Sequence, residues 1–330
     1  MATEKIAVIG SNSFSGAHFV AHCLRAGMEV IGISRSAEPA SVFLPYQWIP
    51  HDRFRFFELD LNRHLSKIVQ VLWEFRPEYI VNFAAQGMVA QSWNSPEDWL
   101  MTNTVSMVRL HEELRKSDSL RKFVHASTPE VYGNTPGLVR EDTPYNPSTP
   151  YAVSKAACDM SLLAFRNAYN FPVALTRAAN VCGPGQQLYR IIPKTIFCIL
   201  NGQRLKLEGG GASVRSFIHV RDVCDGTLQV VRQAPPGEIF HLATDRQTSI
   251  RELVETICRK MNVPFERCME VVERRLGQDT AYRLDCTKAR TVLGWVPRIS
   301  LDQTIDETID WVRTHIDALR AQPATYVHKK

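Results

Sequence analysis

The chain has 330 residues, of which 45% are hydrophobic and 22% are charged, and its formal net charge is +5. This composition is typical of a globular chain with ample core, in one large domain or two joined ones, and disorder is expected only in the last few residues. Lysines and arginines are scattered, so no nucleic-acid-binding surface is predicted. No apolar run approaches the roughly 18 residues of a membrane span, and the N-terminal run is too short for a signal peptide.

Short apolar runs alternate with longer helical patterns along the first half of the chain. Strands are predicted at residues 5–9, 29–33, 54–59, 79–85, 122–127 and 172–177, with a helix near residues 65–75. This alternation is typical of parallel βαβ units. The predicted fold class is therefore α/β, a Rossmann-type doubly wound parallel sheet. After about residue 180, glycine-rich breaks and frequent arginines indicate a smaller second domain.

The first predicted strand ends at a glycine and leads through a polar turn to a second glycine, where a helical pattern begins. A strand, a glycine turn and a helix in this order direct backbone N–H groups at a dinucleotide pyrophosphate. Ser13 replaces the middle glycine of the usual pattern. The residues predicted to form this cofactor-binding loop are Gly10, Asn12, Ser13, Phe14, Ser15 and Gly16.

The second predicted strand is followed by Ser34, Arg35 and Ser36. An acidic residue usually stands here in NAD-binding proteins, where it accepts a hydrogen bond from the ribose 2′-hydroxyl. With no carboxylate to repel a 2′-phosphate, and an arginine able to pair with one, NADP is favoured over NAD. The alternative is that Arg35 is a surface residue over the adenine and that the cofactor is NAD.

Cysteines and histidines give no sign of a metal site. Eight cysteines occur without a Cys-x-x-Cys pair, so we expect reduced, mostly buried thiols rather than a disulfide framework or a zinc site. His125 and His219 fall within apolar strand patterns and are interpreted as core residues. No set of histidines and carboxylates has metal-ligand spacing, so we predict no metal. The cysteine usage fits the cytoplasm.

Tyr151 and Lys155 are four residues apart in a helical pattern and therefore lie on one face of a helix. A nearby cation favours the phenolate, so the tyrosine pKa, about 10 when unperturbed, can fall toward neutrality. Tyr151 could then act as an acid or base at neutral pH. A solvated tyrosine and lysine on a helix would show the same spacing.

The chain resembles the extended short-chain dehydrogenases/reductases, and within them the nucleotide-hexose 4,6-dehydratases of the GDP-mannose and dTDP-glucose types. The resemblance runs nearly end to end. The matching stretches are residues 10–16, 82–86, 102–103, 126–133, 150–155, 177–186, 215–222 and 274–279. It implies an NAD(P)-binding Rossmann domain at residues 1–180, with a return segment near 216–243, and a nucleotide-sugar-binding domain at 181–215 and 244–330.

The resemblance also implies a tightly bound NADP or NAD that is recycled within one turnover. Beyond the glycine loop, its contacts would be Arg35, Ser36, Asp60, Leu61, Ala84, Ala85, Gln86, Asn103, Tyr151 and Lys155. The nucleotide sugar would contact Gln86, Thr128, Asn180, Arg190, Leu205, Lys206, Arg215, Arg274 and Asp279. Arginine forks suit diphosphate oxygens, whereas a hydrophobic edge strand would account equally well for Leu205 and Lys206.

Catalytic roles follow from the same resemblance. Tyr151 would be the base for oxidation at C4 of the hexose, Lys155 would lower its pKa and hold the nicotinamide ribose, and Thr128 would hydrogen-bond the C4 oxygen. Glu130 would then remove the C5 proton while the C6 hydroxyl leaves as water, and hydride would return to C6. The product would be a nucleotide-linked 4-keto-6-deoxyhexose.

Pro129 departs from the family pattern, which has aspartate here in the dTDP-glucose type and serine in the GDP-mannose type. Because proline donates no proton, Glu130 is expected to pass the C5 proton to the leaving hydroxyl. The enzymatic alternative is a nucleotide-sugar epimerase or UDP-glucuronate decarboxylase, which needs no proton donor at C6. A non-catalytic, cofactor-binding regulator is the alternative from another class, and the intact Thr128, Tyr151 and Lys155 argue against it.

Relatives of this kind use two helices in a two-fold four-helix dimer interface. In this chain they would be the helix that begins at Tyr151 and the one near residues 97–116. Small residues that would allow close packing of the first helix are Ala152, Ala156, Ala157 and Ala164, although packing against the sheet would explain them equally. The predicted partners are a nucleotide-diphosphate sugar and a second copy of the chain, as a homodimer or dimer of dimers, with no nucleic acid and no membrane.

Overall fold

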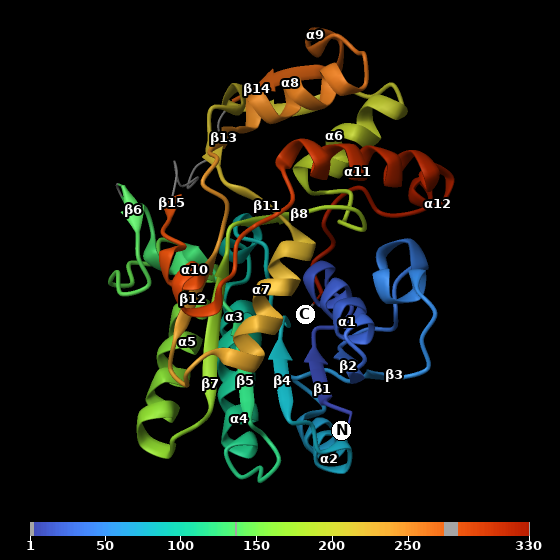
Figure 1. Cartoon of the computed structure of the whole chain (residues 1–330). Coiled ribbons are helices and arrows are strands. Elements are labelled where there is room, and N and C mark those ends of the chain that lie inside the picture. The colour runs from blue at the N-terminus through green and yellow to red at the C-terminus, as the bar shows by residue number, and fades with distance from the viewer. Residues whose placement is uncertain (1–2, 136, 274–282, 330) are drawn as a thin grey trace.

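The computed structural model describes residues 3–135, 137–273 and 283–329 (Figure 1). Within these residues, a central parallel sheet has seven strands in the order β12-β7-β5-β4-β1-β2-β3. The strands are β1 (Lys5–Ile9), β2 (Glu29–Ser34), β3 (Phe54–Glu58), β4 (Tyr79–Asn82), β5 (Lys122–Ala126), β7 (Val173–Ala178) and β12 (Ile239–Leu242). The first six lie where the sequence predicts strands. The predicted doubly wound α/β fold is therefore confirmed.

Helices cover both faces of this sheet. α1 (Phe14–Arg25) and α7 (Val220–Gln233) pack on one face, whereas α2 (Leu65–Phe75), α4 (Ser106–Leu114) and α5 (Pro150–Tyr169) pack on the other. Successive strand residues point to opposite faces. In β1, Val8 belongs to the core with α1 and α7, and Ala7 and Ile9 belong to the core with α2, α4 and α5. Strands buried on both sides read as continuous apolar runs, which explains their clear sequence signal.

A second group of elements lies over the carboxyl ends of the strands (Figure 1). Its helices are α6 (Ile191–Leu200), α8 (Ile250–Lys260), α9 (Phe265–Cys268), α11 (Leu301–Thr314) and α12 (Ile316–Arg320). Its paired strands are β8 (Asn180–Cys182) with β11 (Phe217–His219), β9 (Leu205–Glu208) with β14 (Met269–Val272), and β10 (Val214–Arg215) with β13 (Thr248–Ser249). Between these elements the chain returns to the main sheet through α7 and β12. The exact domain boundaries stay a prediction.

One further strand pair and one further helix complete the fold, and two predicted elements differ in extent. β6 (Leu138–Val139) pairs with β15 (Arg283–Leu284), and α10 (Thr287–Leu293) packs on α7 and β12. The strand predicted at residues 79–85 ends at Asn82, so Ala84 and Ala85 belong to the following loop. The helix predicted near residues 97–116 consists of α3 (Pro96–Leu100), a π-helical turn (Met101–Val105) and α4.

All eight cysteines are buried with free thiols, as the sequence predicts. His125 and His219 are also buried, each 1% exposed. No helix among the described residues is long and apolar enough to cross a membrane. Within the same part of the chain, no group of three or more histidine, cysteine or acidic side chains is placed to hold a metal ion.

His111 is a buried polar group in α4 that should make folding depend on pH. Its ring lies 5.1 Å from the Phe123 ring and 6.0 Å from the Phe171 ring, and neither ring nitrogen has a hydrogen-bond partner among the described residues. Burial lowers the pKa of His111 to about 3. The folded state therefore holds this imidazole neutral, whereas the unfolded chain takes up a proton below about pH 6.5. The stability present above that pH is lost progressively as the pH falls toward 3.

We therefore expect His111→Leu to stabilise the protein, and to do so more in acid. Removing two buried, unpaired nitrogens should raise the free energy of unfolding by about 1–3 kcal/mol at neutral pH. At about pH 5 the gain should be about 2 kcal/mol larger, because the variant no longer loses a proton on folding. Urea unfolding at both pH values measures the difference, with the exposed His51→Leu as control. Equal gains at both pH values would contradict this account.

Candidate active site

The turn between β1 and α1 requires both of its glycines. Gly10 has a φ of +84°, and a Cβ atom there would lie 2.4 Å from the backbone nitrogen of Ala84. A Cβ atom on Gly16 would lie 2.1 Å from the carbonyl oxygen of Gly10. The first glycine therefore lets the turn approach the loop after β4, and the last lets α1 begin close to the strand.

Ser13 takes over the position where the usual pattern has a glycine. Its hydroxyl donates to the Gly10 carbonyl oxygen at 2.7 Å and accepts from the Gly16 backbone nitrogen at 3.1 Å. It is therefore the N-cap of α1, a role that serine performs well. Phe14 is buried and Ser15 half-buried in the first turn of the helix. The departure from the glycine pattern thus leaves the strand–turn–helix geometry intact.

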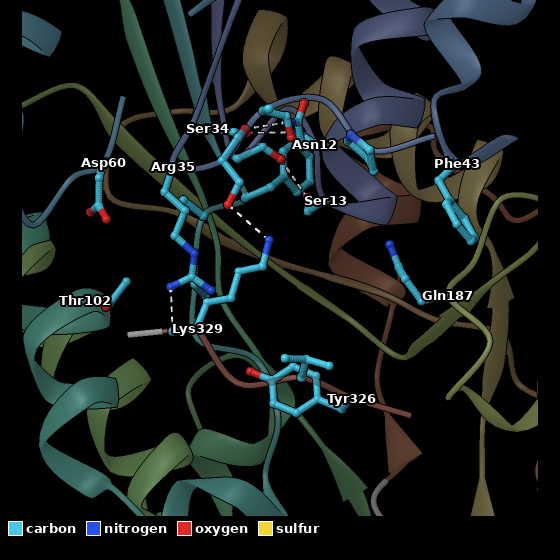
Figure 2. Close-up of a pocket in the computed structure, with 18 of the residues that line it drawn as sticks. Asn12, Ser13, Ser34, Arg35, Phe43, Asp60, Thr102, Gln187, Tyr326 and Lys329 are labelled. Atoms are coloured by element: carbon cyan, nitrogen blue, oxygen red, sulfur yellow. Dashed lines mark hydrogen bonds between the residues drawn. The ribbon is translucent and has the colours of Figure 1, made fainter. Parts of the chain in front are cut away.

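The end of β2 is tied to the same turn. The Asn12 backbone nitrogen donates to the Ser34 hydroxyl at 3.0 Å, and the Asn12 side chain donates to the Ser36 carbonyl oxygen at 3.0 Å. Arg35 lies between these contacts and points into the adjoining cleft (Figure 2). The residues that the sequence assigns to the pyrophosphate and to the adenosine ribose are therefore held side by side.

The loop after β4 is positioned by one asparagine from the π-helical turn. The Asn103 side chain accepts from the Gln86 backbone nitrogen at 2.8 Å and donates to the Gln86 carbonyl oxygen at 3.0 Å. It also donates to the Ser154 hydroxyl in α5 at 2.9 Å. π-Helical turns occur frequently at functional sites. Here the turn joins the predicted cofactor loop to the helix that carries Tyr151 and Lys155.

These loops enclose a cleft with a volume of ≈ 400 Å³ at the carboxyl ends of β1, β2 and β4 (Figure 2). Predicted cofactor residues that line it are Gly10, Asn12, Ser13, Arg35, Ser36, Asp60, Leu61, Ala84 and Ala85. Ligands bind at this edge of open α/β sheets. The close backbone approach at Gly10 and the position of the cleft beside the turn suit a dinucleotide, so the residues present fit NAD or NADP.

Thr128 and Glu130 belong to a capped turn after β5. Thr128 is the N-cap of a 3-10 helix (Pro129–Tyr132), and its hydroxyl accepts from the Glu130 backbone nitrogen at 3.3 Å. Proline is favoured at the first helical position, where its missing N–H costs no hydrogen bond. Pro129 therefore has a clear local structural role. The turn holds Thr128 and Glu130 at the carboxyl end of the strand.

Tyr151 lies beside this turn at the start of α5. Its phenol is hydrogen-bonded to the Thr128 side chain, and the charges that act on it come from Glu130, Arg190 and Asp159. Burial and the Glu130 carboxylate raise the pKa of Tyr151 above its usual value, although the bond with Thr128 and the Arg190 charge oppose this. The expected fall of this pKa beside Lys155 is therefore absent in the structure.

Lys155 contacts residues of β5 rather than Tyr151. Its Nζ atom lies 2.8 Å from His125 Nε2 and donates to the Ala126 carbonyl oxygen at 2.8 Å. Asn82 Oδ1 accepts from the Ala84 nitrogen, so Asn82 Nδ2 is the group that donates to His125 Nδ1, at 3.2 Å. Burial lowers the pKa of both Lys155 and His125.

The predicted substrate residues fall into separate groups. Arg190, at the N-cap of α6, is close enough to Tyr151 for its charge to act on the phenol. Asn180 donates to the carbonyl oxygen of Ser216, the neighbour of Arg215 in the chain. Leu205 is buried in the core between β9 and α8, and Lys206 is exposed on the same strand. Arg274 and Asp279 lie outside the described residues.

Part of the cleft comes from residues that the sequence reasoning missed. They are Phe43, Gln187, Leu188 and Tyr189, together with several of residues 322–329. The proximity of Gln187 to the matched stretch 177–186 was an available signal, whereas Phe43 has none. The sequence predicts disorder at the end of the chain, but these residues are hydrogen-bonded across the cleft.

A β1–turn–α1 cleft beside a helix with Tyr-x-x-x-Lys defines an NAD(P)-binding protein of the extended short-chain dehydrogenase/reductase class. The family model described as GDP-mannose 4,6-dehydratase matches residues 8–308. The chain therefore belongs to the GDP-mannose 4,6-dehydratase family, and it is an NAD(P)-dependent sugar-nucleotide dehydratase, a hydro-lyase.

Individual relatives agree with this assignment. A dTDP-glucose 4,6-dehydratase from Streptomyces antibioticus is 32% identical over 331 residues, which cover 96% of each chain. A UDP-glucose 4-epimerase from Mycolicibacterium smegmatis is 33% identical over 311 residues, covering 93% of this chain and 97% of the relative. The crystal structure of a dTDP-glucose 4,6-dehydratase from Streptomyces venezuelae with NAD bound has a TM-score of 0.88 and 29% identity, and covers 95% of this chain and 98% of that one.

Proposed function

We propose that this chain converts a nucleoside-diphosphate hexose to the 4-keto-6-deoxyhexose with loss of one water. The observation that supports this most directly is the placement of Glu130 beside Tyr151, because the carboxylate is near enough to raise the pKa of the phenol. An acid–base group for C4 and a second one for C5 are thus adjacent. A simple 4-epimerase needs only the first of these groups.

The glycine loop would hold the cofactor pyrophosphate, and Arg35 and Asp60 would lie along its adenosine. When bound, the nicotinamide supplies a hydride acceptor for C4 and a hydride donor for C6. Tyr151 accepts the C4 hydroxyl proton while Thr128 holds the C4 oxygen, and the new carbonyl makes the C5 proton acidic. Glu130 removes that proton and passes it to the C6 hydroxyl, which leaves as water. After hydride reaches C6 a proton returns to C5, so one substrate gives one product and one water.

Pro129 explains why Glu130 would act twice. The residue between Thr128 and Glu130 has no proton to give, and it is buried in the capped turn. The C6 hydroxyl must therefore be protonated by Glu130 or by water. Arg190 and Arg215 remain the proposed ligands of the substrate diphosphate, since guanidinium groups pair well with its oxygens.

The direct test is to incubate the purified protein with dTDP-glucose, GDP-mannose, UDP-glucose, CDP-glucose and UDP-N-acetylglucosamine separately, and to analyse each product by mass spectrometry. We expect one of them to lose one water. An unchanged mass with an altered sugar configuration by NMR would favour an epimerase, which the relative from Mycolicibacterium smegmatis makes the leading alternative. Loss of carbon dioxide from UDP-glucuronate would indicate a decarboxylase.

Glu130→Gln should separate the two halves of the reaction. The amide cannot take the C5 proton, so water loss should fall by about 10²–10⁴-fold. Oxidation at C4 should continue, because Tyr151 and Thr128 are unchanged, and reduced nicotinamide should accumulate by absorbance. The control is Glu74→Gln, an exposed carboxylate on α2. Normal formation of the 4-keto-6-deoxy product by Glu130→Gln would remove Glu130 from this role.

We also propose that the chain forms a homodimer through α5 and the α3–α4 region. Exposed large hydrophobic side chains gather on these elements: Leu100, Met101, Val105, Val153 and Met160. Apolar side chains that cover one another across a two-fold axis would leave water on association. Sedimentation equilibrium should then give twice the mass of the 37.4 kDa chain.

A further inference from the structure

Residues 322–329 form one wall of the cofactor cleft. Pro323, Thr325, Tyr326, Val327 and Lys329 line the same cavity as the glycine loop. Figure 2 shows Tyr326 and Lys329 on the side of the cleft opposite Asn12 and Ser13. We call residues 322–329 the C-terminal segment. It is separated by nearly the whole sequence from the β1–α1 turn that it faces.

Three contacts on its own side hold the C-terminal segment in place. His328 Nε2 lies 2.8 Å from an Asp98 carboxylate oxygen in α3, and the His328 ring stacks on Trp99 with centroids 4.9 Å apart and planes within 9°. The Tyr326 ring meets the Tyr189 ring edge-on, with centroids 5.6 Å apart. Trp99 is fully buried, so the stacking surface is rigid. These contacts anchor the chain directly before Lys329.

Lys329 connects two sides of the cleft. Its carbonyl oxygen accepts from Gln86 Nε2 at 2.7 Å and from Arg35 Nη1 at 3.0 Å. Its ammonium group donates to the Ser36 hydroxyl at 3.2 Å. Figure 2 shows the Lys329 side chain reaching past Arg35 toward the end of β2. The ammonium thus lies at the place where a dinucleotide-binding fold holds the adenosine ribose.

The charges at this point are unbalanced. Among the residues that the structure describes, neither Arg35 nor Lys329 has a carboxylate within ion-pair distance. Asp60 also lines the cleft, but its carboxylate accepts from the Asn62 backbone nitrogen at 2.7 Å. Two cations and a serine hydroxyl therefore lie along one part of the cleft, and among the described residues neither cation is in ion-pair contact with a carboxylate. Guanidinium, ammonium and hydroxyl donors together are the groups that bind a phosphate.

We propose that Lys329 is a cofactor-binding residue that, with Arg35 and Ser36, selects a dinucleotide carrying a phosphate on the adenosine 2′-oxygen. This inference rests on the proposed cofactor site and extends it. The C-terminal segment would then help to bind the 2′-phosphate, together with Arg35 and Ser36, which follow β2. Related structures contain NAD, so this chain would differ from them in cofactor choice.

The test uses two probes that lack the nicotinamide, adenosine 2′,5′-bisphosphate and 5′-AMP, with binding measured by isothermal titration calorimetry. The wild-type protein should bind the bisphosphate at least about tenfold more tightly, because charge-assisted hydrogen bonds to the extra phosphate add to affinity. In Lys329→Ala this preference should fall by about fivefold or more, while 5′-AMP affinity stays the same. Added salt should weaken the preference in the wild type, since its origin is electrostatic.

Further variants separate charge from simple packing. Lys329→Arg should keep most of the preference, and Lys329→Gln should lose it. His328→Ala should also reduce the preference, because it releases the contact with Asp98 and Trp99 that positions Lys329. The control is Lys67→Ala, an exposed lysine on α2, which should bind both probes like the wild type. All these positions are at the surface or near the chain end, so folding should be retained.

Several results would overturn the inference. Equal wild-type affinity for the two probes, or an unchanged preference in Lys329→Ala, would show that Lys329 does not select the phosphate. Tighter binding of both probes by Lys329→Ala would show that the C-terminal segment competes with the cofactor. If a sugar nucleotide still loses water in any of these cases, the proposed function stands and only this role falls. If neither probe binds, the proposed cofactor site is wrong, and the inference fails with it.

Discussion

Tyr151→Phe should reduce the oxidation of substrate at C4 by about 10³-fold, because it removes the group that accepts the C4 hydroxyl proton. The phenylalanine keeps the ring in place, so the loss should appear in kcat rather than in substrate affinity. Stopped-flow absorbance of the reduced nicotinamide measures the step directly. Tyr169→Phe, which removes an exposed phenol at the end of the same helix, is the matched control. A rate near that of the wild type would exclude Tyr151 as the base.

The raised pKa of Tyr151 adds a pH dependence to this prediction. The phenol accepts a proton only as phenolate, so the rate of C4 oxidation should rise with pH through the neutral range. The Glu130 carboxylate is one cause of the raised pKa. In Glu130→Gln the profile should therefore shift to lower pH, even though water loss is blocked. A profile that does not move would show that Glu130 and Tyr151 are not coupled.

Asp159→Asn should produce the largest loss of stability. Asp159 and Arg177 form a fully buried ion pair with 2.9 Å between Oδ2 and Nη2, and the same oxygen accepts from the Ser127 hydroxyl at 2.6 Å. Removing one partner leaves the other charge buried and unpaired, which costs about 3–5 kcal/mol. The rings of Tyr132 and Tyr145 stack on the guanidinium but cannot replace the carboxylate.

Urea unfolding of Asp159→Asn and of Asp118→Asn makes the comparison. Asp118 pairs with Arg76 at 3.1 Å, but both side chains are mostly exposed and screened by solvent, so this change should cost little stability. Because Ser127 precedes Thr128, the Asp159 variant should also lower activity by misplacing the catalytic turn. Similar losses of stability in the two variants would show that burial of the Asp159–Arg177 ion pair is not what makes its loss costly.

The fold was accessible from the sequence because its signal is local. Strands buried on both faces, such as β1 and β4, are continuous apolar runs, and the pattern shows them without reference to the rest of the chain. The turn from Gly10 to Gly16 was recognisable for a similar reason, since its geometry demands particular residues at short spacing. Even there, the sequence did not show that Ser13 would cap α1.

The surroundings of Tyr151 and Lys155 were harder to predict from the sequence. The spacing of Tyr151 and Lys155 predicts that they share a helix face, but it does not show what else lies there. Glu130 raises the pKa of Tyr151, while His125 and Ala126 hold the Lys155 amine. These contacts depend on how β5 and α5 pack together. The spacing of apolar residues along a helix or strand does not show which other element packs against it.

The strand–turn–helix motif, the individual strands and the Tyr-x-x-x-Lys helix could be predicted from the sequence, because each depends on residues close together in the chain. The ion pair of Asp159 with Arg177 and the residues 322–329 that line the cofactor cleft could be found only in the folded structure. Gln86 and Lys329 are 243 residues apart, yet they are hydrogen-bonded across that cleft. Contacts between such distant residues form only when the chain folds, so no local sequence pattern predicts them.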